Sequence, residues 1–219
     1  MIDVMIPGEA GKLHAVYSKA DDPTAPLAIV LSGNPRSGFH MNDRISYAMF
    51  RAFMDVGFSA LRFNYRGVGD SEGNVGTTAD NMIDIATVID WLQNQNEDSD
   101  RIWLSGNQLG TWYCLQAMMR RPEVSGFVLV SPDHSISDFS FLSPRPNRGL
   151  LVQGANEEED ALAFSPYLTQ MLKRSAKIDL ETIIIKNADA KYATPDVLKQ
   201  LYADIKAYVG RENEDMRLL

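Results

Sequence analysis

Short apolar runs alternate along the chain with segments that carry apolar residues at helical spacing. Runs that are apolar at nearly every position are typical of strands covered on both faces, as in a parallel sheet. We therefore expect six such strands in one sheet. The runs are 27–31, 60–65, 102–104, 127–130, 150–152 and 182–185.

Helices are predicted between these strands, with one apolar face each. Pro166 marks the expected start of the fourth helix, since proline suits the first helical turn. The last helix is expected to begin after Thr194, with Pro195 in its first turn, and to stop at Gly210. The helical segments are 42–56, 82–92, a stretch after Gly110, 162–172 and 195–210.

The first residues, from about 4 to 17, are expected to form a hairpin that leads into the first parallel strand. Alternating strands and helices with short connections predict a doubly wound, mostly parallel α/β sheet. We expect one domain over residues 1–210, followed by a polar C-terminal tail, 211–219, that would fray. Ligands of such sheets bind outside the carboxyl ends of the strands.

Composition narrows the classes of function. The net charge is −8, which argues against a nucleic-acid-binding protein, since phosphate contacts need clustered Lys and Arg. The longest apolar runs are too short to span a bilayer, and Met1 to Met5 lack the basic start of a signal peptide. One cysteine, Cys114, and three histidines show no metal-ligand spacing. We expect a cytoplasmic protein with no metal, cofactor, membrane or nucleic-acid partner.

A strand, a tight turn between two glycines and a helix are predicted around residue 108. Gly106 and Gly110 are four residues apart, which is the spacing of a G-x-S-x-G nucleophile elbow. In that motif the glycines let strand and helix approach closely, and the central residue sits at the tip. The central residue here is Gln108. A carboxamide has no ionisable proton to surrender and is a poor nucleophile.

Three further segments strengthen this motif: GNPRSGFHMN at 33–42, LRFNYRGVGDSEG at 61–73 and DFSFL at 138–142. With the elbow, they resemble the α/β-hydrolase superfamily over almost the whole chain. More narrowly, the chain is similar to a bacterial group of small predicted esterases related to dienelactone hydrolases. The resemblance implies a three-layer α/β/α hydrolase fold with a minimal lid or none. One departure is that the family's leading His-Pro is Ser32-Gly33 here.

Carried over by position, the family's Ser–acid–His triad falls on Gln108, Glu157 and Ala190. The acid position keeps a carboxylate, with further acidic residues after it. The nucleophile and the base are both missing, and loss of either usually leaves only residual catalysis. The resemblance therefore implies a degenerate triad. The leading hypothesis is a pseudoenzyme with a binding, scaffolding or regulatory role.

The retained cleft is expected to bind a small-molecule ligand through polar groups at the strand ends. The backbone N–H of Leu109 is expected to act as an oxyanion-hole-like donor. The candidate ligand-binding residues are Asn34, Arg36, His40, Gln108, Leu109 and His134.

Two alternatives stay open. The chain could be an esterase-like hydrolase with a relocated nucleophile and base, such as Ser32 with His40 or His134. It could also act as an interaction subunit, either a homo-oligomer or the partner of an active paralogue. The apolar residues that would supply such a contact surface are Trp112, Tyr113, Phe139, Phe141 and Tyr167.

Overall fold

Residues 1–136 and 138–217 are described by the computed structural model, and within them eight strands form one sheet. Their order across the sheet is β1-β2-β4-β3-β5-β6-β7-β8, with parallel pairing from β4 to β8. The expected doubly wound sheet is confirmed. The strands are β1 (Ile2–Gly8), β2 (Gly11–Ser18), β3 (Leu27–Leu31), β4 (Ser59–Phe63), β5 (Ile102–Gln108), β6 (Val124–Pro132), β7 (Arg148–Gly154) and β8 (Asp179–Ile185).

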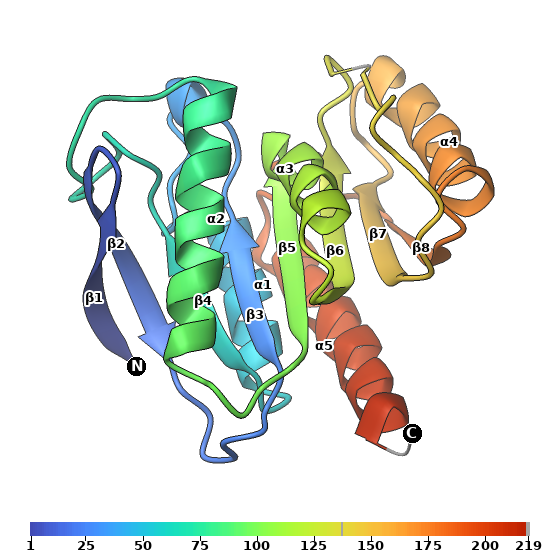
Figure 1. Ribbon diagram of the computed structural model, residues 1–219. Helices are drawn as coiled ribbons and strands as arrows, with labels where there is room; N and C mark the ends of the chain where they lie inside the picture. Colours follow the sequence, from blue (N-terminus) through green and yellow to red (C-terminus); the bar gives the residue numbers. More distant parts are fainter. Residues whose placement is uncertain (137, 218–219) are drawn as a thin grey trace.

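Helices cover both faces of the sheet (Figure 1). The helices α2 and α3 lie in front of the sheet in that view, with α1 and α5 behind it. Two apolar cores fill the space on either side, and the buried leucines of α4 belong to the same core as α2 and α3. The helices are α1 (Arg44–Met54), α2 (Thr78–Asn94), α3 (Leu109–Arg120), α4 (Glu159–Arg174) and α5 (Pro195–Arg217), with a short 3₁₀ helix η1 (Pro35–Ser37) after β3.

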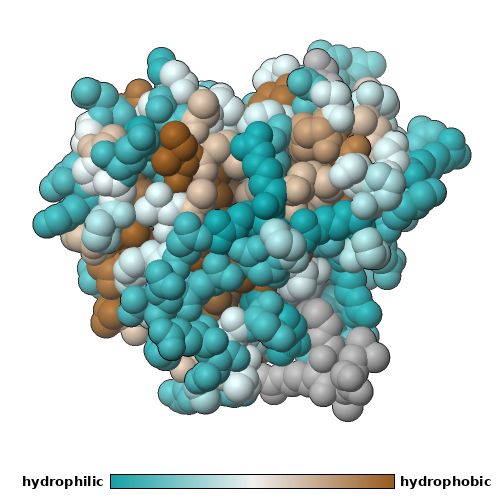
Figure 2. Space-filling view, viewed as in Figure 1, coloured by the Kyte–Doolittle hydropathy of each residue, from teal (hydrophilic) through white to brown (hydrophobic). Residues whose placement is uncertain are grey.

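The edges of the sheet are less covered than its centre. At one edge, Ile184 of β8 is 65% exposed, although its run was expected to be buried on both faces. At the other edge, Ile2 and Met5 of β1 are exposed, and Figure 2 shows hydrophobic colour gathered over that strand. No helix within residues 1–136 and 138–217 is long and apolar enough to cross a membrane.

The helix ends correct two expectations. Pro166 lies inside α4 and does not start it. The start is set earlier, where the acidic Glu159 and Asp160 occupy the first turn, because negative charge stabilises a helix N-terminus. Buried residues of α4 on both sides of Pro166 then hold the helix together across the missing backbone donor.

The C-terminal helix likewise continues past Gly210 as far as Arg217. A stop at that glycine, with a separate tail from 211, was therefore wrong for 211–217, and 218–219 lie outside the described residues. Tertiary contacts hold the extra turns. Glu212 pairs with Arg148 of β7 at 2.7 Å, and Arg211 pairs with Glu181 of β8 at 2.7 Å.

A buried ion pair fixes the loop after β4. The Asp84 carboxylate accepts hydrogen bonds from the Arg66 backbone N–H at 2.9 Å and from Nε and Nη2 of its guanidinium at 2.9 and 2.7 Å. Both side chains are buried. Because two ions of opposite sign satisfy each other here, the loop is held on α2 without an unpaired buried charge.

Candidate functional site

The turn between β5 and α3 has the geometry of a nucleophile elbow. Gln108 closes the strand with φ 52° and ψ −123°, a strained conformation for a residue with a Cβ. A Cβ added to Gly106 would lie 2.4 Å from the Gly110 carbonyl carbon, and one added to Gly110 would lie 2.4 Å from the Leu31 oxygen. The two glycines are therefore required by close packing, and Gln108 occupies the tip.

Glu157, which the resemblance places at the acid position, is a buried carboxylate held by three donors. Oε1 of Glu157 accepts hydrogen bonds from the Ser131 hydroxyl at 2.5 Å and from the Gly154 N–H at 2.7 Å. Its Oε2 accepts one from Nε2 of Gln153 at 3.1 Å. Burial raises the pKa of Glu157 above its ordinary value, although these hydrogen bonds pull in the opposite direction. The carboxylate is thus oriented by groups on β6 and β7, and no histidine ring of the described residues hydrogen-bonds to it.

Ala190, which the resemblance places at the base position, lies in the loop between β8 and α5 and lines the same cavity as Gln108. Two residues further on, Tyr192 is fully buried, with φ 47°. Its hydroxyl lies 3.3 Å from the Ser131 hydroxyl oxygen. Burial raises the pKa of Tyr192, so the phenol stays protonated. A hydrogen-bonded chain therefore runs from Tyr192 through Ser131 to Glu157.

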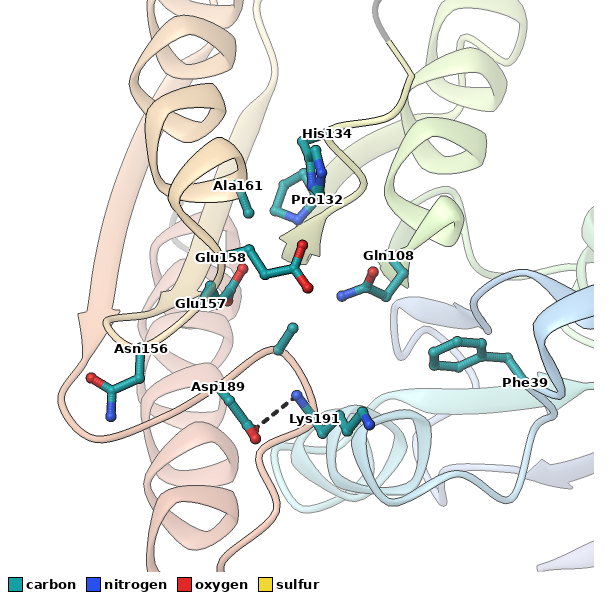
Figure 3. A pocket seen from close by; sticks show the side chains of 11 residues that line it. Phe39, Gln108, Pro132, His134, Asn156, Glu157, Glu158, Ala161, Asp189 and Lys191 are labelled. Atoms are coloured by element: carbon teal, nitrogen blue, oxygen red, sulfur yellow. Dashed lines mark hydrogen bonds between the residues drawn. The ribbon is translucent and has the colours of Figure 1, made fainter.

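These three positions surround a cavity of about 370 Å³ at the carboxyl ends of the strands (Figure 3). In the figure the Gln108 carboxamide and the Glu158 carboxylate point toward each other across the cavity. Its lining residues come from the ends of β5 and β6, from the loops after β3, β6, β7 and β8, and from the first turn of α4. The lining residues are Phe39, Gln108, Pro132, His134, Asn156, Glu157, Glu158, Ala161, Asp189, Ala190 and Lys191.

The expected ligand-binding residues divide into two groups. Gln108 and His134 line the cavity, and Leu109 follows at the first position of α3. The other three lie in the loop after β3, outside the lining. Asn34 accepts a hydrogen bond from the Arg36 N–H at 3.0 Å and so caps η1. The Arg36 guanidinium donates to the Gly76 carbonyl oxygen at 3.3 Å.

His40 is the third residue outside the lining, and its ring is occupied by local contacts. Nδ1 accepts a hydrogen bond from the Asn42 N–H at 3.1 Å, and Nε2 lies 3.5 Å from the Asp43 carboxylate. The residue of this loop that reaches the cavity is Phe39. Sequence reasoning selected polar residues and missed this aromatic one, because only the loop conformation decides which side chain turns inward.

Other residues that sequence reasoning did not select come from the segments beside the triad positions. Asn156 and Glu158 flank Glu157, and Asp189 and Lys191 flank Ala190. Their adjacency to those positions was the available signal. Ser131 left no such signal, because it reaches Glu157 from another strand.

A displaced catalytic pair does not form in the described part of the chain. Within residues 1–136 and 138–217, no serine or cysteine side chain hydrogen-bonds to a histidine ring nitrogen. Ser32 is 1% exposed, and its hydroxyl has no hydrogen-bond partner. Cys114 is fully buried in α3, where burial raises the pKa of its thiol well above the ordinary value.

The aromatic residues expected at a contact surface are partly packed against one another. Tyr113 and Phe139 are buried, Trp112 and Phe141 are half-buried, and Tyr167 is 51% exposed. The Trp112 and Phe141 rings meet edge to face with their centroids 5.8 Å apart. Packing thus accounts for most of this set, and only Tyr167 stands clear of the core.

Comparison with known proteins identifies the family. The model of the X-Pro dipeptidyl-peptidase (S15) family matches residues 10–207. A protein of Rickettsia prowazekii described as uncharacterized is 31% identical over 92% of this chain and 87% of its own length.

Solved structures with a similar fold also include α/β hydrolases. A protein of unknown function from Agrobacterium tumefaciens, described as a candidate α/β hydrolase, is 32% identical over 98% of this chain and 97% of its own, with a TM-score of 0.90. A lidless α/β serine hydrolase from Xanthomonas campestris shares the fold at 22% identity, with 96% and 94% of the two chains covered and a TM-score of 0.80. These matches confirm the resemblance to α/β hydrolases that the motifs indicated. The chain belongs to the X-Pro dipeptidyl-peptidase (S15) family and has the α/β-hydrolase fold.

Proposed function

We propose that this chain is a non-catalytic α/β-hydrolase homologue that binds a small molecule in the cavity beside Gln108. The observation that carries the proposal is the residue at the elbow tip. Gln108 has the strained backbone of a nucleophile, with φ 52°, but its carboxamide has no proton to lose and attacks carbonyl carbon poorly.

The base position supports the same conclusion. Ala190 lines the cavity with a methyl group only, so nothing at that position accepts a proton. Glu157 keeps its orienting hydrogen bonds, but the group that it would orient is gone. A carboxylate without an imidazole leaves the triad chemistry without its proton carrier.

The rest of the site is suited to binding. A cavity of about 370 Å³ lies near the lower end of the size range of small-molecule sites. Seven of its eleven lining residues are polar or charged, and the apolar ones are Phe39, Pro132, Ala161 and Ala190, so the wall is more polar than that of most small-molecule sites. The α3 N-terminus at Leu109 adds backbone N–H groups that no side chain caps.

The test is turnover of p-nitrophenyl acetate by the purified protein. We expect a rate equal to the buffer rate for the wild-type chain and for the Gln108→Ala variant alike. Fast turnover that is lost in Gln108→Ala would overturn the proposal. The variant keeps a Cβ at the strained position, so the comparison isolates the carboxamide.

A hydrolase with a relocated base remains the second candidate, because His134 lies in the cavity wall. The sequence suggested Ser32 as the nucleophile, yet Ser32 is almost fully buried and outside the cavity lining. Ester hydrolysis that falls to the buffer rate in both His134→Ala and Ser32→Ala, with melting temperatures unchanged, would favour this candidate over a binding protein.

A further inference from the structure

The cavity wall carries more negative than positive charge. Glu157, Glu158 and Asp189 supply carboxylates to it, and Lys191 supplies the one ammonium group of the lining. Among the described residues none of these three carboxylates forms an ion pair with a Lys, Arg or His side chain. Carboxylates that share a cavity without a counter-ion repel one another, and desolvation makes the buried one more costly.

Glu157 has room for one more donor. A carboxylate offers about four lone-pair sites to hydrogen-bond donors. Oε1 already receives the Ser131 hydroxyl and the Gly154 N–H, while Oε2 receives only Nε2 of Gln153. The Ala190 side chain, at the position that the resemblance assigns to the imidazole, supplies no N–H group. A donor that enters from the cavity therefore finds a buried acceptor that is oriented and incompletely used.

An aromatic ring lies on the opposite side of the cavity. Figure 3 shows Phe39 across the cavity from Glu157, Glu158 and Asp189. The ring is wedged against the backbone, since a Cβ added to Gly33 would lie 2.8 Å from two of its carbon atoms. Carboxylates facing an aromatic ring are a common arrangement for organic cations, because the ring face attracts positive charge and the ring edge packs against alkyl groups.

We propose that the cavity binds a small organic cation, an ammonium or imidazolium group with an attached apolar part. Its N–H groups face the carboxylates of Glu157, Glu158 and Asp189. The apolar part packs against Phe39, Pro132 and Ala161. This assignment rests on the proposed binding function and adds the chemical class of the ligand to it.

The experiment is calorimetric titration of the full chain with n-butylammonium, with imidazolium as a second cation and with n-butyrate as the matched anion. We expect both cations to bind and butyrate not to bind. The cation affinity should fall as ionic strength rises, because partly exposed charges are screened.

Matched variants locate the site. Glu158→Gln combined with Asp189→Asn removes two cavity charges, and we expect butylammonium affinity to fall about tenfold or more. The control is Glu159→Gln combined with Asp160→Asn, which removes two exposed charges from the first turn of α4 that are outside the cavity lining. The control should keep the wild-type affinity within about twofold. If the first double variant melts early, Glu158→Gln alone replaces it, since the Glu158 side chain is exposed.

Two results would overturn the assignment: butyrate binding as tightly as butylammonium, or equal loss of affinity in both double variants. Failure of the cation assignment is distinguishable from failure of the proposed function. If no cation binds and no ester is turned over, only the assignment of an organic cation as the ligand is wrong. Ester turnover that depends on Gln108 removes the proposed function, whatever the cations do.

Discussion

The Ser131 hydroxyl donates a 2.5 Å hydrogen bond to the carboxylate of Glu157 across 26 residues of sequence. Ser131 holds φ 46°, so the backbone at the end of β6 is strained where the contact is made. This bond joins β6 to the loop after β7 beside the cavity that Glu157 lines. It keeps the Glu157 carboxylate buried and oriented at the edge of the cavity that Gln108 and Ala190 also line.

Removal of that hydroxyl should destabilise the fold. In Ser131→Ala the buried Oε1 of Glu157 keeps only the Gly154 N–H, and a lost hydrogen bond to a buried charged group costs about 1.5–3 kcal/mol. Urea unfolding measures the change. Ser135→Ala is the matched control, because its hydroxyl bonds only to Asp133 on the surface. Equal unfolding midpoints for the two variants would contradict the role given to Ser131.

Glu157 also predicts a pH dependence. Burial raises its pKa in the folded chain above the ordinary 4.5. As pH rises past 4.5, the unfolded chain therefore loses this proton before the folded chain does. The stability tied to protonated Glu157 is complete below 4.5 and is lost as pH rises through the folded-state pKa.

Glu157→Gln removes this titration. The wild-type free energy of unfolding minus that of the variant should therefore fall from pH 4 upward and level off above the folded-state pKa of Glu157. Urea titrations at several pH values measure the difference. A difference that does not change with pH would show that Glu157 is not titrating in this range.

Strain at the elbow predicts a stabilising substitution. Gln108 adopts φ 52° and ψ −123°, which costs about 1–3 kcal/mol for a residue with a Cβ. Gln108→Gly relieves this strain in the folded chain. Glycine also raises the conformational entropy of the unfolded chain, which offsets part of the gain, so we expect about 1 kcal/mol of added stability. Gln108→Ala keeps the strain and serves as the control. If the melting temperature of Gln108→Ala equals or exceeds that of Gln108→Gly, the backbone at this position does not store strain.

Breaking the buried ion pair between Arg66 and Asp84, in the loop after β4, should lower the free energy of unfolding more than breaking an exposed ion pair does. Asp84→Asn removes the charge of the carboxylate whose Oδ1 accepts hydrogen bonds from both Nε and Nη2 of the buried Arg66, at a cost of about 3 kcal/mol. Asp90→Asn breaks the exposed pair with Arg121 and should cost less than about 1 kcal/mol. Denaturant unfolding of Asp84→Asn and Asp90→Asn measures the two losses of stability. Similar shifts of the unfolding midpoint would mean that the buried pair stabilises the fold no more than the exposed pair does.

Installing a serine and a histidine at the positions that the family resemblance assigns to nucleophile and base asks whether this scaffold supports hydrolysis through a triad. The Gln108→Ser/Ala190→His double variant places a hydroxyl at the elbow tip and an imidazole beside the oriented Glu157. We expect p-nitrophenyl acetate turnover above that of either single variant, because each group needs the other. Adding Glu157→Gln to the double variant should lower that rate. A double variant no faster than either single variant would show that the cavity does not accommodate the acyl-transfer geometry.

Much of the fold was predictable from local pattern. The apolar runs that became β3 to β7 are buried on both faces, and such runs carry their own signal in sequence. The elbow was predictable as well, because Gly106 and Gly110 are demanded by a backbone approach within one strand–turn–helix unit. The resemblance to α/β hydrolases placed Gln108, Glu157 and Ala190 after three different strands, and the structure gathers these residues around one cavity.

Only the tertiary structure decided the rest, because those features depend on contacts between distant segments. Gly210 reads as a helix stop, yet α5 continues since Glu212 and Arg211 find partners on β7 and β8. The loop after β3 turns Phe39 into the cavity and leaves His40 with its neighbours Asn42 and Asp43. The sequence by itself determined which chemical groups stand at the strand ends. Packing between strands and loops determined which of those groups face the cavity and which are occupied elsewhere.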